Sequence, residues 1–305
     1  MKNMQQPFLD KLEDVTGSFK AILLDAYGVF WAGNALGLLP GSKIAMETLV
    51  AQGKVVGILS NSTQLSSKEI AKLESHGLLQ GKHFHFLLTS GQIANEVFLK
   101  QEIPFPTPRK TFMTFGKPHP KFSPHIAIFQ DTIYEETFLL EEADFAYISI
   151  PHINGEDQID PKVFLEEILK IKSKNIPMIC ANPDRFAEEG SPSRFVVRQG
   201  SIASLYESLG GQVFYIGKPF KKAYSQAMKQ FEKLGIITPS DILMIGDTPE
   251  TDIRGAKKFG MSSALVIETG VTAHRIHNEG KEKTLENLSE EQTPNFFIKR
   301  FSYDV

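Results

Sequence analysis

Residues 21–29 read AILLDAYGV: an apolar run, an aspartate at its end and a turn that contains glycine. The same order of an apolar run and a polar turn recurs along the chain. The other runs span residues 55–59, 213–216 and 242–245, and the polar residues that follow them are Ser60, Lys218 and Asp247. Short runs that are apolar throughout are typical of buried parallel strands.

Helical patterns follow these runs. They cover residues 41–52, 66–76, 220–234 and 249–259. The last pattern has Thr248 as its N-cap, Pro249 at its first position and Gly260 just beyond its end, an arrangement common in helices. The alternation predicts an α/β fold with a doubly wound, Rossmann-like parallel sheet. Ligands of such sheets bind outside the carboxyl ends of the strands, so we expect the four polar residues to meet there.

The chain of 305 residues is long enough for two domains. A long insertion between the second and third runs has its own alternation, with strands expected at 110–114, 145–149 and 177–180 and a helix at 161–172. We therefore expect a core formed by residues 1–100 and 212–305. Residues 101–211 are expected to form an inserted cap domain over the carboxyl edge of the core sheet. Residues 295–301 would add a last edge strand to that sheet.

The composition restricts the function and the compartment. The net charge is −3 at pH 7, which provides no basic field for nucleic acid and no polybasic face for a membrane. The apolar runs are too short to span a bilayer, and the first residues lack the apolar segment of a secretion signal. Cys180 is the single cysteine, so no internal disulfide can form. A reducing, cytoplasmic location is expected.

Asp25 is the first candidate for chemistry. An aspartate at the end of a strand is often only a turn former, but Gly28 allows the backbone to approach a ligand, and a carboxylate can act as a covalent nucleophile toward phosphorus. Ser60 and Asn61 follow the second strand. Capping of the helix at 66–76 is the plainer interpretation, but a hydroxyl and backbone N–H groups there suit a phosphoryl oxygen.

Lys218 lies in a Gly-Lys-Pro turn, where a lysine is commonly a surface residue. Opposite Asp25 it would neutralise the charge of a phosphoryl group in transfer. Asp247 and Asp252 would add two carboxylates and form a hard oxygen site that suits Mg²⁺. Asp252 could instead complement the dipole of the helix that contains it.

Three other residues carry metal-binding or nucleophilic side chains. His83 and His85 alternate in an expected strand, where partly exposed side chains are commoner than metal ligands. Cys180 ends an apolar run and is more typical of a core residue than of a nucleophile.

Taken together, these residues resemble a known family. The sequence is similar to the haloacid-dehalogenase-like superfamily, in its NagD-like branch (subfamily IIA), which includes 4-nitrophenyl-phosphatase-like and pyridoxal-phosphatase-like enzymes. The resemblance covers nearly the whole chain. It rests on the order of these motifs: Asp25-x-x-Gly28-Val29, Leu39-Pro40-Gly41, Leu59-Ser60-Asn61-Ser62-Thr63, Leu88-Thr89-Ser90-Gly91, Asn182-Pro183-Asp184, Gly200-Ser201-Ile202, Gly217-Lys218-Pro219 and Gly246-Asp247-(x)4-Asp252.

The resemblance implies a role for each matching residue. Asp25 would be the nucleophile that forms an aspartyl-phosphate. Ser60 would bind a phosphoryl oxygen with Asn61 nearby, and Lys218 would bridge the phosphate and Asp25. The ligands of Mg²⁺ would be Asp25, the backbone carbonyl of Tyr27 and Asp247, with Asp252 in support.

The resemblance also concerns the inserted domain, which would be a C2-type cap. Its loop at residues 182–192 would contact the leaving group and set the substrate specificity. The residues of that loop expected to do so are Asn182, Asp184 and Arg185. Homodimers formed through the cap are common in this branch, so the resemblance leaves a homodimer open, whereas the sequence itself does not indicate the oligomeric state.

Tyr27 departs from the family pattern. Phosphatases of this superfamily usually carry an aspartate two residues after the nucleophile, where it transfers protons. A phenol with a pKa near 10 is a poor base at neutral pH, and loss of a positioned acid or base costs roughly 10² to 10⁴ in rate. Tyr27 is therefore expected to slow the reaction, although its hydroxyl could still donate a hydrogen bond to the leaving oxygen.

The sequence thus predicts a Mg²⁺-dependent phosphomonoester hydrolase that acts on a small phosphorylated metabolite. Tyr27 leaves two alternatives open. One is a protein that binds a phosphate ligand or regulates without efficient turnover. The other is a 2-haloacid dehalogenase, since a tyrosine follows the nucleophile at the same place in that group. Those enzymes need no metal, so the Gly246-Asp247-(x)4-Asp252 motif and the NagD-like cap argue against this alternative.

Overall fold

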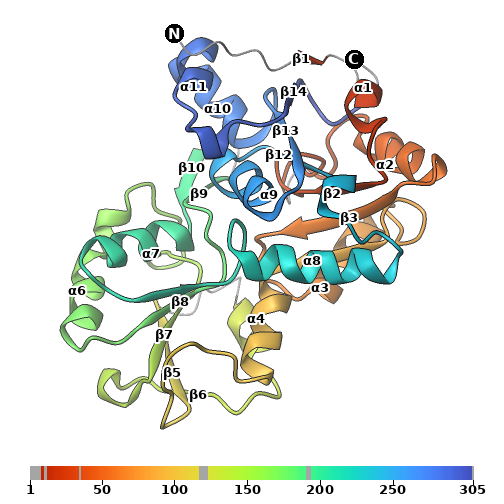
Figure 1. The fold of residues 1–305 in the computed structure, drawn as a ribbon. Coiled ribbons are helices and arrows are strands. Elements are labelled where there is room, and N and C mark those ends of the chain that lie inside the picture. Colours follow the sequence, from red (N-terminus) through yellow and green to blue (C-terminus); the bar gives the residue numbers. More distant parts are fainter. Residues whose placement is uncertain (1–7, 10–11, 34–35, 117–122, 190–193, 304–305) are drawn as a thin grey trace. The chain divides into compact units, whose positions relative to one another are not determined.

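The computed structural model describes residues 8–9, 12–33, 36–116, 123–189 and 194–303. The chain forms two compact units (Figure 1). The first comprises residues 1–60, 67–88 and 221–305, and the second comprises residues 61–66 and 89–220. Residues 61–66, 89–100 and 212–220, expected in the core, group with the second unit. The assignment of residues 101–211 as a specificity cap stays a prediction.

A seven-stranded sheet organises the first unit, in the order β1-β14-β13-β12-β2-β3-β4. All pairs from β1 to β3 are parallel, which confirms the doubly wound α/β prediction. The strands are β1 (Phe8–Leu9), β2 (Ala21–Leu24), β3 (Val55–Ser60), β4 (Phe86–Thr89), β12 (Ile242–Gly246), β13 (Ser262–Val266) and β14 (Phe296–Ile298).

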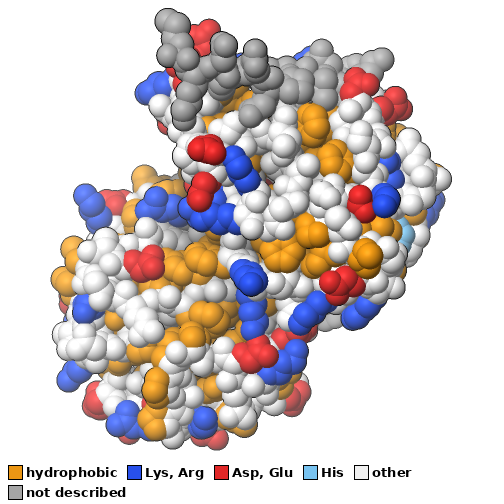
Figure 2. Space-filling model, viewed as in Figure 1, with side chains coloured by type: hydrophobic (Ala, Val, Ile, Leu, Met, Phe, Trp, Pro, Cys, Tyr) orange, Lys and Arg blue, Asp and Glu red, His pale blue; other side chains and the backbone are white. Residues whose placement is uncertain are grey.

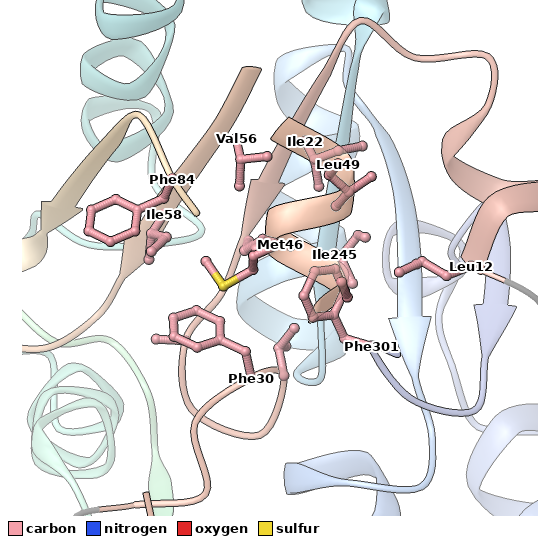
Figure 3. Packing of buried hydrophobic residues seen from close by; sticks show 14 of the residues in the cluster. Leu12, Ile22, Phe30, Met46, Leu49, Val56, Ile58, Phe84, Ile245 and Phe301 are labelled. Atoms are coloured by element: carbon pink, nitrogen blue, oxygen red, sulfur yellow. The ribbon is translucent and has the colours of Figure 1, made fainter. Parts of the chain in front are cut away.

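Helices contribute to hydrophobic packing on both faces of this sheet. They are α1 (Leu12–Thr16), α2 (Ser42–Ala51), α3 (Ser66–Ser75), α8 (Lys221–Lys233), α9 (Arg254–Phe259), α10 (Gly270–Glu279) and α11 (Lys281–Glu286). Met46 and Leu49 of α2 pack against Ile22 and Ile58 of the sheet (Figure 3). On the α8 side, the rings of Phe86 and Phe231 meet edge to face, 4.8 Å apart. Burial on both faces explains why the strands are apolar throughout.

The second unit contains a five-stranded parallel sheet in the order β11-β8-β7-β5-β6. Phenylalanines pack beside it, and Phe112 and Phe129 stack with ring centroids 3.7 Å apart. The strands are β5 (Thr111–Phe115), β6 (Glu135–Glu136), β7 (Phe145–Ile148), β8 (Met178–Cys180) and β11 (Val213–Tyr215), with a separate hairpin of β9 (Phe186–Glu189) and β10 (Arg194–Val197). The helices are α4 (Ser90–Leu99), α5 (Pro124–Phe129), α6 (Leu165–Ser173) and α7 (Gln199–Ser208).

Three expectations about strands were wrong. Strand β11, which leads to Lys218, pairs with β8 in the smaller sheet, so the four strand ends do not lie at the edge of one sheet. Strand β14 is not an edge strand, because β1 pairs outside it. His83 and His85 are not strand residues, since both precede β4, and His83 is buried in a turn.

Two helices begin differently from the patterns. The helix expected at 161–172 starts as a 3₁₀ turn at 161–164, capped by Asp160, whose carboxylate accepts the N–H of Lys162. Residues 249–253 form a π-helical turn before α9. This wider turn brings the Asp252 carboxylate back to the backbone at residues 247 and 248, and such turns are frequent at functional sites.

The surface agrees with the small net charge. Basic and acidic side chains are both spread over the face in view in Figure 2. Within the described ranges, every helix is too short or too polar to cross a lipid bilayer.

Candidate active site

Asp25 and Asp247 lie side by side because their strands pair. Leu24 of β2 is in register with Ile245 of β12, and the N–H of Asp25 donates to the Ile245 carbonyl at 2.9 Å. Asp25 directly follows the last residue of β2, and Asp247 directly follows the last residue of β12. With Asp252 they form a group of buried carboxylates, in which one oxygen of each residue lies within 4.8 Å of the chosen oxygens of the other two.

The environment of Asp247 favours a bound cation. Val271 donates its N–H to Oδ2 at 2.6 Å, and the Thr248 hydroxyl donates to Oδ1 at 3.0 Å. Burial, together with the neighbouring carboxylates of Asp25 and Asp252, raises the pKa of Asp247 well above its usual value. A divalent cation that accepts oxygen ligands would relieve this repulsion, so the donor set fits Mg²⁺.

Asp252 holds the backbone that carries Asp247. Its Oδ2 accepts the N–H groups of Asp247 at 3.2 Å and Thr248 at 3.0 Å. Thr248 occupies the N-cap position as expected, but its hydroxyl makes no cap bond and donates to Asp247 instead. The Tyr224 hydroxyl donates to the carbonyls of Thr251 and Asp252 at 3.2 and 3.0 Å, which fixes this turn from α8.

Two glycines leave room for the Asp247 carboxylate. Gly28 has φ = 81° and Gly270 has φ = 68°, a conformation that glycine adopts without strain. A Cβ atom on either residue would collide with the Asp247 carboxylate. The Thr269 hydroxyl also donates to the Gly28 carbonyl at 2.6 Å. Sequence reasoning missed Thr269, Gly270 and Val271, although they follow β13 in the same strand-and-turn pattern as the other candidates.

Tyr27 is built into a cluster of side chains. The residue is 37% exposed, and its hydroxyl oxygen accepts a hydrogen bond from Lys72 Nζ at 3.1 Å. The ammonium group lies 5.2 Å from the centroid of the Tyr27 ring and 5.1 Å from that of Trp31, and it pairs with Glu69. Burial alone would lower the pKa of Lys72, but its interactions with Tyr27 and Glu69 raise that pKa.

Ser60 is the last residue of β3. Because β3 pairs with β2 in parallel, with Ile58 in register with Leu24, Ser60 lies at the same edge of the sheet as Asp25. Its side chain is buried. The first unit thus brings together these expected residues at the carboxyl ends of adjacent strands: Asp25, Tyr27, Ser60, Asp247 and Asp252. The sequence did not indicate a role for Glu69 or Lys72, whose only pattern is their spacing on a helix.

The second unit brings another set of expected residues together. The Asn61 side chain contacts the backbone of Lys218 and the carboxylate of Asp184. The Asn182 side chain accepts the N–H of Asp184 at 2.9 Å, and Arg185 donates to the Ser204 hydroxyl at 2.8 Å. Of the loop expected at 182–192, residues 190–192 lie outside the described residues.

Two further side chains of this unit are buried. Lys218 is 1% exposed, and lysine is seldom buried to this degree unless it is paired. Cys180 is buried, and its thiol donates to the Asn182 carbonyl at 3.1 Å. Burial raises the pKa of this thiol well above its usual value, so it is an unreactive core residue, as expected.

Comparison with known proteins places these residues in context. Residues 215–297 match the family model described as HAD-hydrolase-like. Chronophin of Rattus norvegicus is 23% identical over 267 residues, which cover 86% of this chain and 80% of that protein. The sugar-phosphatase AraL of Bacillus subtilis is 25% identical over 266 residues, covering 83% of this chain and 85% of that protein.

Solved structures share the fold. A haloacid dehalogenase-like hydrolase from Brucella suis superposes with a TM-score of 0.77 at 23% identity, over 96% of this chain and 99% of that chain. A 4-nitrophenylphosphatase from Thermotoga maritima does so with a TM-score of 0.64 at 21% identity, over 95% and 97% of the two chains.

Proposed function

We propose, since the chain is similar to haloacid-dehalogenase-like hydrolases in sequence and fold, that it is a Mg²⁺-dependent phosphatase for a small phosphorylated metabolite. The observation that carries the proposal is the group of buried carboxylates formed by Asp25, Asp247 and Asp252. Burial of three acidic groups is costly in free energy without a cation. Asp25 directly follows strand β2, and it is the proposed nucleophile.

Asp25 is the nucleophile of the proposed reaction. Its carboxylate oxygen attacks phosphorus, the bond between phosphorus and the leaving oxygen breaks, and the alcohol departs with a proton taken up from solvent. Water then attacks the phosphorus, releases inorganic phosphate and returns the Asp25 carboxylate. The residues that would hold Mg²⁺ are Asp25, Asp247 and the backbone carbonyl of Tyr27, with Asp252 in support. When bound, the ion would neutralise charge on the phosphoryl oxygens.

Other residues bind the phosphoryl group and the leaving group. Ser60 donates its hydroxyl to a phosphoryl oxygen, with Asn61 next to it, and Lys218 supplies a point cation. Asn182, Asp184 and Arg185 contact the leaving group from the inserted cap, residues 101–211. This loop sets which phosphorylated metabolite is accepted.

A second candidate function rests on Tyr27. Its hydroxyl accepts a hydrogen bond from Lys72 in the place where the family usually has a proton-transferring aspartate. A protein with this substitution could bind a phosphate ligand and regulate, with little turnover. The 2-haloacid dehalogenase alternative is weaker, because a metal-free reaction gives no reason for the three buried carboxylates.

Metal binding can be tested apart from turnover. Mg²⁺ at 100 times its Kd should stabilise the wild type by about 2.7 kcal/mol, measured as a rise in Tm. Asp247→Asn should abolish this rise, and the variant without metal should be at least as stable as the wild type because one buried negative charge is gone. A wild-type Tm that does not respond to Mg²⁺ would rule out the proposed metal site.

Turnover then separates the candidate functions. A panel of phosphomonoesters assayed with Mg²⁺ should give phosphate release if the protein is a phosphatase. Binding of inorganic phosphate without release from any ester would favour the regulatory function. Release of halide from a 2-haloacid without metal would establish the dehalogenase.

We also propose a cytoplasmic location and a homodimer. The single, unreactive Cys180 is compatible with a reducing compartment. Light scattering during size-exclusion chromatography measures the mass directly, and a value near 34.1 kDa would contradict the dimer.

A further inference from the structure

We propose that Asn61 is a positioning residue that fixes Lys218, and that it couples Asp184 of the expected specificity loop to this lysine. The inference rests on the proposed function, because Lys218 matters to catalysis only if it binds the phosphoryl group. It assigns Asn61 a role that differs from direct contact with phosphate.

The side-chain amide of Asn61 makes two hydrogen bonds with the backbone of Lys218, and we call this pair of bonds the clasp. Its Oδ1 accepts the N–H of Lys218 at 2.8 Å, and its Nδ2 donates to the carbonyl of Lys218 at 3.2 Å. Asn61 is 3% exposed, so these bonds form away from water, where an unmade hydrogen bond is costly. Asn61 thereby fixes the position of the main chain from which the Lys218 side chain extends.

The same amide reaches the expected specificity loop. Nδ2 donates to Asp184 Oδ1 at 2.9 Å. Asp184 is held from other directions as well, since its N–H donates to Asn182 Oδ1 at 2.9 Å and its carbonyl accepts the N–H of Gly200 at 3.0 Å. A displacement of Asp184 would therefore be transmitted to Lys218 through a single side chain.

The close packing around this clasp leaves little freedom. A Cβ atom on Gly217 would collide with Asn61 Oδ1 and with Pro183, and one on Gly200 would collide with the Pro183 carbonyl. The backbone segments thus approach one another at distances that only glycine permits. These contacts hold the two glycine positions, Asn61 and the Asn182–Asp184 turn in one arrangement.

The hydrogen bonds also explain why Asn61 would act indirectly. An amide nitrogen has two N–H groups, and these serve Asp184 Oδ1 and the Lys218 carbonyl. Its donors are therefore engaged within the protein and are not aimed at a phosphoryl oxygen. Any effect of the side chain on phosphate must pass through Lys218.

Asn61 and Lys218 lie near the two points at which the chain enters and leaves the second unit. Asn61 is the first residue after the chain enters the second unit, and Lys218 comes shortly before residue 221, where the chain returns to the first unit. The two residues are 157 positions apart in the sequence. The amide therefore ties together two segments that the sequence alone does not connect.

A double-mutant cycle tests whether Asn61 acts through Lys218. Asn61→Ala should lower kcat about 10²-fold, the size of effect that a misplacement of about 1 Å can have, with a smaller change in KM. In a Lys218→Ala background the same substitution should lower kcat by less than about twofold, since residues that act as a unit are not additive. Independent, multiplicative losses would overturn the proposal.

A matched control is available in the same unit. Asn95 also donates its amide to a backbone carbonyl, that of Ile128 at 2.8 Å, but it has no bond to Lys218. Asn95→Ala should therefore leave kcat and KM within about twofold of the wild type. A loss equal to that of Asn61→Ala would mean that the effect is a general loss of structure, and would also overturn the proposal.

Hydrogen exchange at the Lys218 amide tests the clasp without any assay of turnover. Asn61→Ala should accelerate this exchange at least tenfold, because the N–H loses its acceptor, whereas Asn95→Ala should not. If Asn61→Ala does not fold, Asn61→Ser, which is too short to bridge both backbone groups, carries the same expectation. Unchanged exchange overturns the clasp, while faster exchange in a protein without phosphatase activity would mean that only the proposed function has failed.

Asp184 provides the test of coupling. Asp184→Ala should speed exchange at Lys218 and lower kcat for all phosphomonoesters by a similar factor. Asp184→Asn keeps an oxygen acceptor for Asn61 and should restore slow exchange and most of kcat. If Asp184→Ala changed only the ratio of kcat/KM between two esters and left the Lys218 exchange unchanged, Asp184 would be a specificity residue without coupling.

Discussion

At the scale of single residues, Tyr27 is a position where this chain departs from the pattern of the family that it resembles. The phenol lies two residues after Asp25, the proposed nucleophile, and its oxygen accepts a hydrogen bond from the Lys72 ammonium group at 3.1 Å. Lys72 also pairs with Glu69, so Tyr27 belongs to a cluster of interacting side chains. Its chemistry at neutral pH still differs from that of a carboxylate, because a phenol gives up its proton with difficulty.

Tyr27→Asp should raise the rate of phosphate release about 10²-fold. A carboxylate at this position can give and take the protons that the phenol holds, and positioned acid–base groups contribute at least this factor. Tyr27→Phe, which removes the hydroxyl but adds no carboxylate, is the control and should give no gain. A rate for Tyr27→Asp that is unchanged or lower would mean that Tyr27 belongs to a different chemistry.

Gly28 makes a second prediction at this scale. Gly28→Ala should lower the free energy of unfolding by more than the roughly 1–2 kcal/mol that a left-handed backbone costs an alanine, since the added Cβ collides with the Asp247 carboxylate. It should also remove the rise in Tm caused by Mg²⁺. Urea unfolding and thermal melts measure both effects.

Gly53 supplies the control for that prediction. Its φ is 79°, almost that of Gly28, and a Cβ there would meet open space. Gly53→Ala should carry the backbone cost alone and leave the response to Mg²⁺ intact. Equal behaviour of the two variants would show that the close approach to Asp247 is unimportant.

At the scale of elements, helix α2 shows how the sequence defines the core. Leu49 is fully buried against the sheet, whereas Ile44 on the same helix is 57% exposed. Leu49→Ala should lower the free energy of unfolding by roughly 2–5 kcal/mol through a cavity in the core. Ile44→Ala should change it by no more than about 0.5 kcal/mol, and comparable losses in urea unfolding would contradict the packing of Figure 3.

The sequence predicts the elements whose causes are local. The apolar runs that end at Asp25, Ser60 and Asp247 form parallel strands, because an uninterrupted apolar run suits a strand buried on both faces. It did not predict the partner of β11, since pairing depends on distant segments. Nor did it predict the π-helical turn at 249–253, which accompanies the bonds of the Asp252 carboxylate to the backbone.

The same distinction holds for the candidate site. The carboxylates of Asp25 and Asp247 could be found from their places at strand ends, and the glycine at position 28 from its place in the first turn. The contact of Lys72 with Tyr27 and that of Asn61 with Lys218 join residues 45 and 157 positions apart. No periodicity connects such pairs, so only the folded chain reveals them.

At the scale of the whole molecule, the charge distribution decides how an anionic substrate can be attracted. The net charge of −3 gives no long-range attraction for an anionic phosphate ester. Local cations therefore have to supply it, and Lys218 and a bound Mg²⁺ are the proposed sources. The association of the substrate should accordingly depend little on ionic strength.

Whether Asp25 is the nucleophile of a Mg²⁺-dependent phosphatase is decided by an assay of 4-nitrophenyl phosphate hydrolysis. The wild type and Asp25→Asn are each assayed with and without Mg²⁺. We expect turnover by the wild type that requires Mg²⁺ and disappears in Asp25→Asn, while both proteins remain folded. A folded wild type that releases no nitrophenol with Mg²⁺, or an Asp25→Asn variant that is as active as the wild type, would contradict this expectation.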